Sequence, residues 1–290
     1  MKQIPVGTCV PGDYFEKMGA AYMDKGFDCF AVNFHMSFGD CPLEDFGKQA
    51  REMAGSNGKF ISTLGLYCNP LLFEEHEKNF HRVIDAAECF GTNHVSTFAG
   101  ALTGESVDAA MPKFKEVFTR LTKHAEDKGV TIAIENCPMG GTWEHTTDNI
   151  GFNPRAWDMM FNEVPSDSLG LEWEATHQMF QLIEPIENLR KYVKKVFHLH
   201  GKDATIRWDE IRKTGFPSNA TPVESRFPGF GDTDWRKVFA ILQQNGYEGT
   251  VDIESFHDEV FGGDWETTGE LHSLNYLKWC RGGDFVPNPW

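Results

Sequence analysis

Long apolar runs are absent from this sequence. Hydrophobic residues make up 40% of the 290 residues, but no uninterrupted stretch reaches the roughly 18 apolar residues that a membrane-spanning helix needs. The N-terminal segment, Met1 to Val10, contains one lysine and no apolar segment of the kind found in secretory signal peptides. We therefore expect a cytoplasmic protein that does not bind a membrane.

Positive charge is also scarce. The chain contains 27 Lys and Arg residues against 43 Asp and Glu residues, which gives a formal net charge of −16. Nucleic acids and anionic membranes are bound by basic side chains that neutralise phosphates, so this balance argues against both as partners. The expected partner is a small molecule.

Cysteine pairs with metal-binding or redox spacing are missing. The seven cysteines are scattered, odd in number, and never form a Cys-x-x-Cys motif. A chain of this size and hydrophobic content buries a large core without disulfides, so we expect reduced thiols. The cysteines are Cys9, Cys29, Cys41, Cys68, Cys89, Cys137 and Cys280.

No low-complexity tract or Pro/Ser-rich linker divides the chain, so we expect a single domain over residues 1–290. Eight short apolar runs have the composition of strands that are buried on both faces. These runs are Ile4–Cys9, Phe27–Phe34, Phe60–Tyr67, His94–Phe98, Val130–Glu135, Leu169–Trp173, Val196–His200 and Thr250–Ile253. Amphipathic patterns predict helices at residues 74–90, 107–128, 235–245 and 271–280.

Strands that alternate with helices in this way predict an α/β fold, a closed parallel (β/α)8 TIM barrel. A doubly wound open sheet is the alternative, but no Gly-x-Gly-x-x-Gly motif follows the first strand, which weakens a dinucleotide-binding interpretation. Long loops are predicted after strands five and seven, at residues 137–153 and 203–232. Both follow strands, so both are expected on the catalytic face of the barrel.

Polar side chains end the last four predicted strands. The fifth strand ends at Glu135, the sixth is followed by Glu174, the seventh ends at His200, and Glu254 follows the eighth. A single strand-end carboxylate is often only a salt-bridge partner. Three carboxylates converging on one barrel mouth would repel each other, and a cation resolves the conflict. One nitrogen and three oxygen donors favour Mn²⁺, Mg²⁺ or Co²⁺, and the absence of a cysteine pair disfavours structural zinc.

The second half of the chain resembles the xylose-isomerase-like barrel superfamily of sugar-phosphate isomerases and epimerases, which includes ketose 3-epimerases and inosose dehydratases. The segments that carry the resemblance are Ile134-Glu135-Asn136, Leu169–His177, Phe197–Asp203, Pro228–Trp235 and Gly246–Glu254. The first half is similar only as a generic barrel. In combination these segments are specific for the superfamily, whereas each is weak alone.

The resemblance implies that Glu135, Glu174, His200 and Glu254 are metal ligands. The family usually has aspartate in an Asp-x-x-His turn, where this sequence has Glu174-Ala-Thr-His177. Glu172 has the same strand parity as Glu174 and competes with it for the second ligand position.

Three further residues belong to the same segments. The resemblance implies that His177 contacts substrate near the metal, although a histidine bonded to a backbone carbonyl is an equally good interpretation. His198 shares the parity of His200, and either orients a ligand or fills the barrel. Lys202 continues the motif and either forms a structural pair with Asp203 or contacts substrate.

A closer resemblance is to the larger subunit of bacterial C-glycoside deglycosidases. The loop 139–152, which contains His145, and the ending 284–289 carry it. It implies cleavage of 3-oxo-glucosides, a small β-rich partner subunit and hence an oligomer, and His145 as general base. Trp143, Trp173 and Trp208 are candidates for a flat wall against an aromatic leaving group.

The resemblance implies proton abstraction next to a carbonyl at a metal that acts as a Lewis acid. In relatives the residues that match Glu135 and Glu254 lie on opposite sides of the ion and exchange protons there, which gives epimerisation. On a 3-oxo-glycoside the same deprotonation leads to β-elimination of the substituent at C1. We therefore hold three hypotheses: a lyase acting on 3-oxo-glucosides, a ketose 3-epimerase or sugar-phosphate isomerase, and a non-catalytic or DNA-processing relative. A DNA-processing relative is disfavoured by the negative charge and the single clear histidine ligand, and the lack of a basic cluster favours an unphosphorylated sugar.

Overall fold

Eight parallel strands close into a barrel in a computed structural model that describes residues 3–216, 222–254, 258–283 and 286–288. Around the barrel the strands follow the order β1-β10-β7-β6-β5-β4-β3-β2. Their bounds are β1 Val6–Pro11, β2 Cys29–His35, β3 Phe60–Tyr67, β4 His94–Thr97, β5 Thr131–Glu135, β6 Leu169–Trp173, β7 Val196–Gly201 and β10 Val251–Ile253. The prediction of a (β/α)8 barrel is confirmed.

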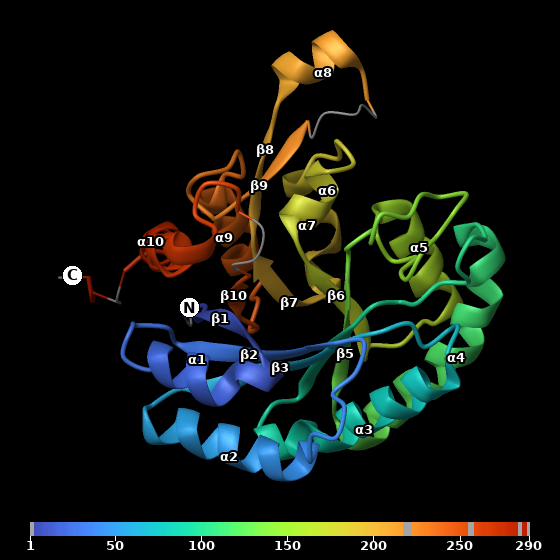
Figure 1. Ribbon diagram of the computed structural model, residues 1–290, viewed down its shortest axis with the longest axis horizontal. Coiled ribbons are helices and arrows are strands. Elements are labelled where there is room, and N and C mark those ends of the chain that lie inside the picture. The colour runs from blue at the N-terminus through green and yellow to red at the C-terminus, as the bar shows by residue number, and fades with distance from the viewer. Residues whose placement is uncertain (1–2, 217–221, 255–257, 284–285, 289–290) are drawn as a thin grey trace.

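Helices surround the barrel, as Figure 1 shows for α1 to α5 along its lower and right-hand sides. The helices are α1 Phe15–Tyr22, α2 Leu43–Ser56, α3 Glu74–Phe90, α4 Val107–Lys128, α5 Pro154–Glu163, α6 Ala175–Met179, α7 Pro185–Tyr192, α8 Trp208–Thr214, α9 Trp235–Gln244 and α10 Glu266–Arg281. Short 3-10 turns occupy Gly12–Tyr14, Val193–Lys195 and Gly263–Trp265. The bounds of α3 and α4 agree with the predicted helices because a glycine with positive φ ends each one.

The core lies in two layers, inside the barrel and between the strands and the helices. Its largest fully buried side chains include Trp157, Trp173, Trp235 and Phe239, which all lie outside the barrel mouth. All seven cysteines are free thiols. Among the described residues, no helix combines the length and the apolar character needed to cross a bilayer.

The connection after β7 forms an arm rather than a plain loop. It contains the antiparallel pair β8 (Asp203–Ile206) and β9 (Val223–Arg226), and α8 lies at its tip, far from the barrel (Figure 1). Asp203 anchors the base of the arm. Its carboxylate accepts hydrogen bonds from the backbone N–H of Thr233 at 3.1 Å and from Trp235 Nε1 at 3.0 Å. Asp203 therefore has a structural role that does not involve a pair with Lys202.

The connection after β5 is tied back to the end of that strand. Asn149 Nδ2 donates to the carbonyl oxygens of Glu135 and Cys137, both at 2.8 Å. Its Oδ1 accepts from the backbone N–H groups of Ala99 and Gly151. One buried amide thus joins the ends of β4 and β5 to the loop and fixes the backbone that carries Glu135.

Candidate metal centre and substrate cavity

Four side chains from neighbouring strands meet at the carboxyl ends of the barrel. Glu135 ends β5, Glu174 follows β6, His200 lies on β7, and Glu254 follows β10. Measured from His200 Nδ1, the nearest carboxylate oxygens of Glu135, Glu174 and Glu254 lie at 3.2, 3.5 and 3.3 Å. One ligand atom from each residue lies within 4.8 Å of the others.

The geometry distinguishes Glu174 from Glu172 as the candidate metal ligand, whereas the alternation of side chains along the strand did not. Both carboxylates point into the barrel, but Glu172 lies one layer deeper and is already hydrogen-bonded. It accepts from Ser96 Oγ at 2.6 Å and from Tyr67 OH at 2.9 Å, and its Oε1 lies 2.6 Å from His198 Nδ1. Glu174 is the carboxylate that joins Glu135 and Glu254 at the mouth.

Asn136 fixes Glu174 relative to Glu135. Its Oδ1 accepts from the backbone N–H of Glu174 at 2.7 Å, and its Nδ2 donates to the carbonyl oxygen of the same residue at 3.0 Å. This reciprocal pair joins the ends of β5 and β6. It gives a physical reason for asparagine directly after Glu135.

Charge is unevenly distributed over the carboxylates. Burial raises the pKa of Glu174 to about 8 and that of Glu135 to about 6. Burial also acts to raise the pKa of Glu254, but the Lys202 ammonium and the His200 ring hold it well below its ordinary value. Lys202 is itself buried and donates to Glu254 Oε1 at 3.0 Å. Of the three acids, Glu254 is the one held most firmly in its ionised form.

The donor set fits a divalent cation. Both carboxylate oxygens of Glu174, Nδ1 of His200 and Oε2 of Glu254 are buried without a hydrogen-bond partner. Buried polar atoms are normally satisfied, and unpaired ones facing each other at this spacing suit ligation. Three oxygens and one imidazole nitrogen, with no cysteine, suit a fairly hard ion such as Mn²⁺ or Mg²⁺.

A cavity of about 490 Å³ is lined by three of these four residues, Glu135, His200 and Glu254. Part of its wall is aromatic, because the Phe98 ring lies 5.4 Å from that of Tyr67 and 6.3 Å from that of His35, centroid to centroid. Asn33 and Met139 also line it. The sequence analysis did not predict this wall. His35 and Tyr67 are polar residues at the ends of β2 and β3, so the signal that identified Glu135 at the end of β5 was present for them too.

Two of the predicted substrate-binding residues lie at this cavity. His177, on α6, lines it, and its Nε2 lies 3.3 Å from Glu174 Oε1. Lys202 lines it as well, 4.0 Å from the same oxygen. Within the described lining Lys202 is the one Lys or Arg, and it is paired with Glu254.

The three tryptophans proposed as an aromatic wall do not line the cavity. Trp173 is fully buried and faces the helices, because Glu172 and Glu174 take the inward positions on either side of it. The Trp143 ring lies 3.7 Å from the Arg155 guanidinium. Trp208 is 48% exposed on α8 in the arm. The aromatic wall therefore comes from the ends of β2 and β3 and from Phe98, which follows β4.

His145 is not brought to the cavity either. It is exposed in the loop after β5, where its Nδ1 lies 3.4 Å from the carbonyl oxygen of Gly104. Met139 and Cys137 are the residues of this loop that line the cavity. Of the C-terminal segment that carried the closer resemblance, residues 284, 285 and 289 lie outside the described residues.

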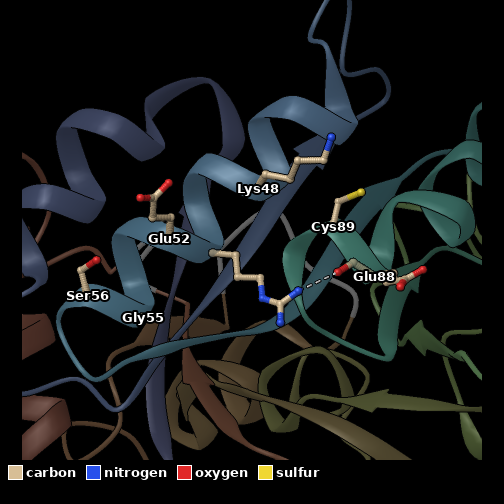
Figure 2. A pocket seen from close by; sticks show the side chains of 7 residues that line it. Lys48, Glu52, Gly55, Ser56, Glu88 and Cys89 are labelled. Atoms are coloured by element: carbon tan, nitrogen blue, oxygen red, sulfur yellow. Dashed lines mark hydrogen bonds between the residues drawn. The ribbon is translucent and has the colours of Figure 1, made fainter.

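A second hollow, of about 700 Å³, lies between α2 and α3 on the outside of the barrel (Figure 2). Lys48, Arg51, Glu52 and Cys89 line it, and Arg51 donates to the carbonyl oxygen of Glu88 at 3.4 Å. Its charged groups are exposed and spread apart. It offers no convergent set of ligands like that of the barrel mouth.

Comparisons with known proteins agree with this geometry. The family described as Xylose isomerase-like TIM barrel matches residues 20–279. An inosose dehydratase of Clostridium beijerinckii is 29% identical over 164 residues, which cover 55% of this chain and 51% of the relative. The match thus spans about half the length of that curated relative.

Solved structures share the fold over nearly the whole chain. A xylose isomerase domain protein from Planctomyces limnophilus has a TM-score of 0.74 at 17% identity, and the match covers 96% of this chain and 97% of that one. The 3-keto-D-glucoside 4-epimerase YcjR from E. coli has a TM-score of 0.69 at 15% identity, and the match covers 95% of this chain and 99% of that one.

Proposed function

The chain belongs to the xylose isomerase-like TIM barrel family, and on that premise we propose that it is a divalent-metal-dependent enzyme that removes the proton next to the carbonyl of a keto-sugar. The observation that carries the proposal is the set of unpaired donor atoms on Glu174, His200 and Glu254 beside a cavity of about 490 Å³. Pockets of this size accept a sugar together with a substituent.

Glu135, Glu174, His200 and Glu254 would hold the metal, which supplies a Lewis acid that stabilises negative charge on the carbonyl oxygen. Glu254 is kept ionised by Lys202 and suits the role of proton acceptor. Glu135, whose pKa burial raises to about 6, suits a group that returns a proton near neutral pH. His177 lines the same cavity and is a candidate to protonate a leaving group.

The preferred reaction is β-elimination from a 3-oxo-glucoside with an aromatic aglycone. The C2 proton is removed, C1 and C2 become double-bonded next to the ketone, and the aglycone leaves with the bonding electrons and gains a proton. The wall of Tyr67, Phe98 and His35 offers the flat surface that an aryl group stacks on. The names of two similar proteins support this reaction. One is a dehydratase, which catalyses an elimination, and the other is a 3-keto-D-glucoside 4-epimerase, which acts on a 3-oxo sugar.

An epimerase or isomerase is the second candidate. A specific observation favours it, because Glu135 and Glu254 both lie next to the His200 ring and differ in pKa, as a proton-exchanging pair requires. We further propose Mn²⁺ as the metal, an unphosphorylated substrate and a cytoplasmic location. A small β-rich partner subunit and an oligomeric assembly stay predictions that rest on the resemblance described above.

The decisive experiment offers purified protein two substrates, with added Mn²⁺ or with EDTA. An aryl 3-keto C-glucoside is followed for release of its aglycone, and a free ketohexose is incubated in deuterium oxide and followed by mass spectrometry. We expect Mn²⁺-dependent release of aglycone. Deuterium uptake without cleavage would instead establish the epimerase. Absence of both reactions under all metal conditions would contradict the proposal.

Two histidine variants test which imidazole serves the reaction. We expect His177→Gln to lose about 100-fold in turnover, because His177 lines the cavity beside Glu174. His145→Ala is expected to keep the wild-type rate, because His145 is exposed outside the cavity. Steady-state kinetics on the aryl 3-keto-glucoside measure both. A loss confined to His145→Ala would show that the loop histidine, not His177, serves the reaction.

A further inference from the structure

Beneath the four candidate ligands lies a buried chain of three charged side chains, Glu172, His198 and Asp252. We propose that these three residues fix the tautomer of His200, so that Nε2 carries the proton and Nδ1 presents its lone pair to the metal. The inference rests on the proposed function, because it presumes that a metal is held at the barrel mouth. It concerns Glu172, His198 and Asp252, which are not among the four ligands proposed above and do not line the cavity.

The chain runs across the interior of the barrel from β6 to β10. His198 Nδ1 lies 2.6 Å from Glu172 Oε1, and His198 Nε2 lies 2.5 Å from Asp252 Oδ2. Asp252 in turn accepts from Thr250 Oγ1 at 2.7 Å and from Cys29 Sγ at 3.1 Å. Both nitrogens of one imidazole thus face carboxylates, which suits a charged ring that donates in two directions.

The link to the metal centre passes through Glu172 and Tyr67. The Tyr67 hydroxyl donates its single proton to Glu172 Oε2 at 2.9 Å. Its oxygen, 3.4 Å from His200 Nε2, is therefore left as an acceptor, and Glu172 Oε1 lies 3.4 Å from the same nitrogen. Two acceptors face Nε2, so the proton of a neutral His200 belongs there.

The other face of the His200 ring completes the argument. His200 Nδ1 is buried and has no hydrogen-bond partner, while three carboxylates lie within 3.5 Å of it. A protonated Nδ1 would donate to these oxygens and compete with a cation for them. Histidine ligands in metalloproteins commonly donate their second N–H to a carboxylate, and loss of that partner typically weakens metal binding 10- to 100-fold.

Space filling alone does not account for these residues. Glu172 and Asp252 are fully inaccessible and His198 is 2% exposed, and burying charge is costly where apolar side chains of similar size would fill the space. The interior of other TIM barrels is mainly packed with branched apolar side chains. Charged residues at this depth are better explained by what they hold in place.

The test combines Mn²⁺ titration calorimetry with NMR of metal-free protein labelled with ¹⁵N-histidine. The spectra are recorded at alkaline pH, because the Glu172 carboxylate raises the pKa of His200 against the effect of burial and a single tautomer exists only in the neutral ring. We expect the wild-type His200 ring to be protonated at Nε2, its signals being assigned by their loss in His200→Ala. We expect Glu172→Gln to give mixed tautomers and to weaken Mn²⁺ binding about 10- to 100-fold. His198→Gln should produce a smaller loss and Asp252→Asn a smaller one still, because each lies one step further from His200.

Glu270→Gln is the matched control. Glu270 is also a fully buried carboxyl, but it lies on α10, bonds to Thr8 and does not line the cavity. It should lower the melting temperature without changing Mn²⁺ affinity. The proposal is overturned if Glu172→Gln binds Mn²⁺ as wild type does and keeps the Nε2–H tautomer, or if affinity follows melting temperature across all four variants. Wild-type protein that binds no Mn²⁺ but keeps this tautomer would instead contradict the metal site of the proposed function.

Discussion

Replacement of Glu254 by glutamine is expected to reduce turnover about 1,000-fold while leaving the barrel folded. Glu254 would supply both a metal ligand and the ionised proton acceptor, and the amide can do neither well. The side chain follows the short strand β10 and its Oε1 accepts from Lys202 Nζ at 3.0 Å. Glutamine keeps the shape and an acceptor oxygen for Lys202, so the loss falls on chemistry rather than packing.

The measurement is kcat and KM on the aryl 3-keto-glucoside with saturating Mn²⁺, together with thermal unfolding. Glu144→Gln is a suitable control, because Glu144 is exposed in the loop after β5 and loses the same charge without touching the cavity. It should behave as wild type. Wild-type turnover of the Glu254→Gln variant would contradict the assignment of Glu135, Glu174, His200 and Glu254 as the metal site.

The barrel strands could be predicted because burial on both faces leaves a plain signature. Phe60–Tyr67 and Leu169–Trp173 are mainly apolar runs, and both agree with the observed strands residue for residue. The arm after β7 could not be predicted in the same way. Its strands, Asp203–Ile206 and Val223–Arg226, are short and polar and pair only with each other among the described strands. The sequence pattern of such a ribbon is the same as that of a loop.

The candidate site was predictable to the level of strand ends and no further. Parity put Glu172 and Glu174 on the same face, and only their depth in the barrel distinguishes the residue held by Ser96 from the one at the mouth. Parity did contain the information to exclude Trp173, which lies between those two positions. His35 was overlooked because a cavity wall depends on contacts between strands that are distant in sequence.

The second large effect is expected at Lys202. Replacement by methionine, which preserves length and apolar volume, should destabilise the metal-free protein by about 3–5 kcal/mol, the usual cost of breaking a buried ion pair from one side. Lys202 is 3% exposed, and its Nζ lies 3.0 Å from Glu254 and 4.0 Å from Glu174. Without it, three carboxylates face each other with no fixed cation except the imidazole of His200.

Addition of Mn²⁺ should recover much of this loss, because two positive charges held by the same carboxylates replace the one removed. Urea unfolding of Lys202→Met and wild type, each with EDTA and with Mn²⁺, measures the effect. Lys195→Met serves as control, since Lys195 bonds to the carbonyl oxygen of Ser166 and precedes β7 at the opposite end of the barrel. Its small loss should be independent of metal. If Mn²⁺ left the gap between Lys202→Met and wild type unchanged, the carboxylates at the mouth would not be sharing a cation, and the pair of Lys202 with Glu254 would be purely structural.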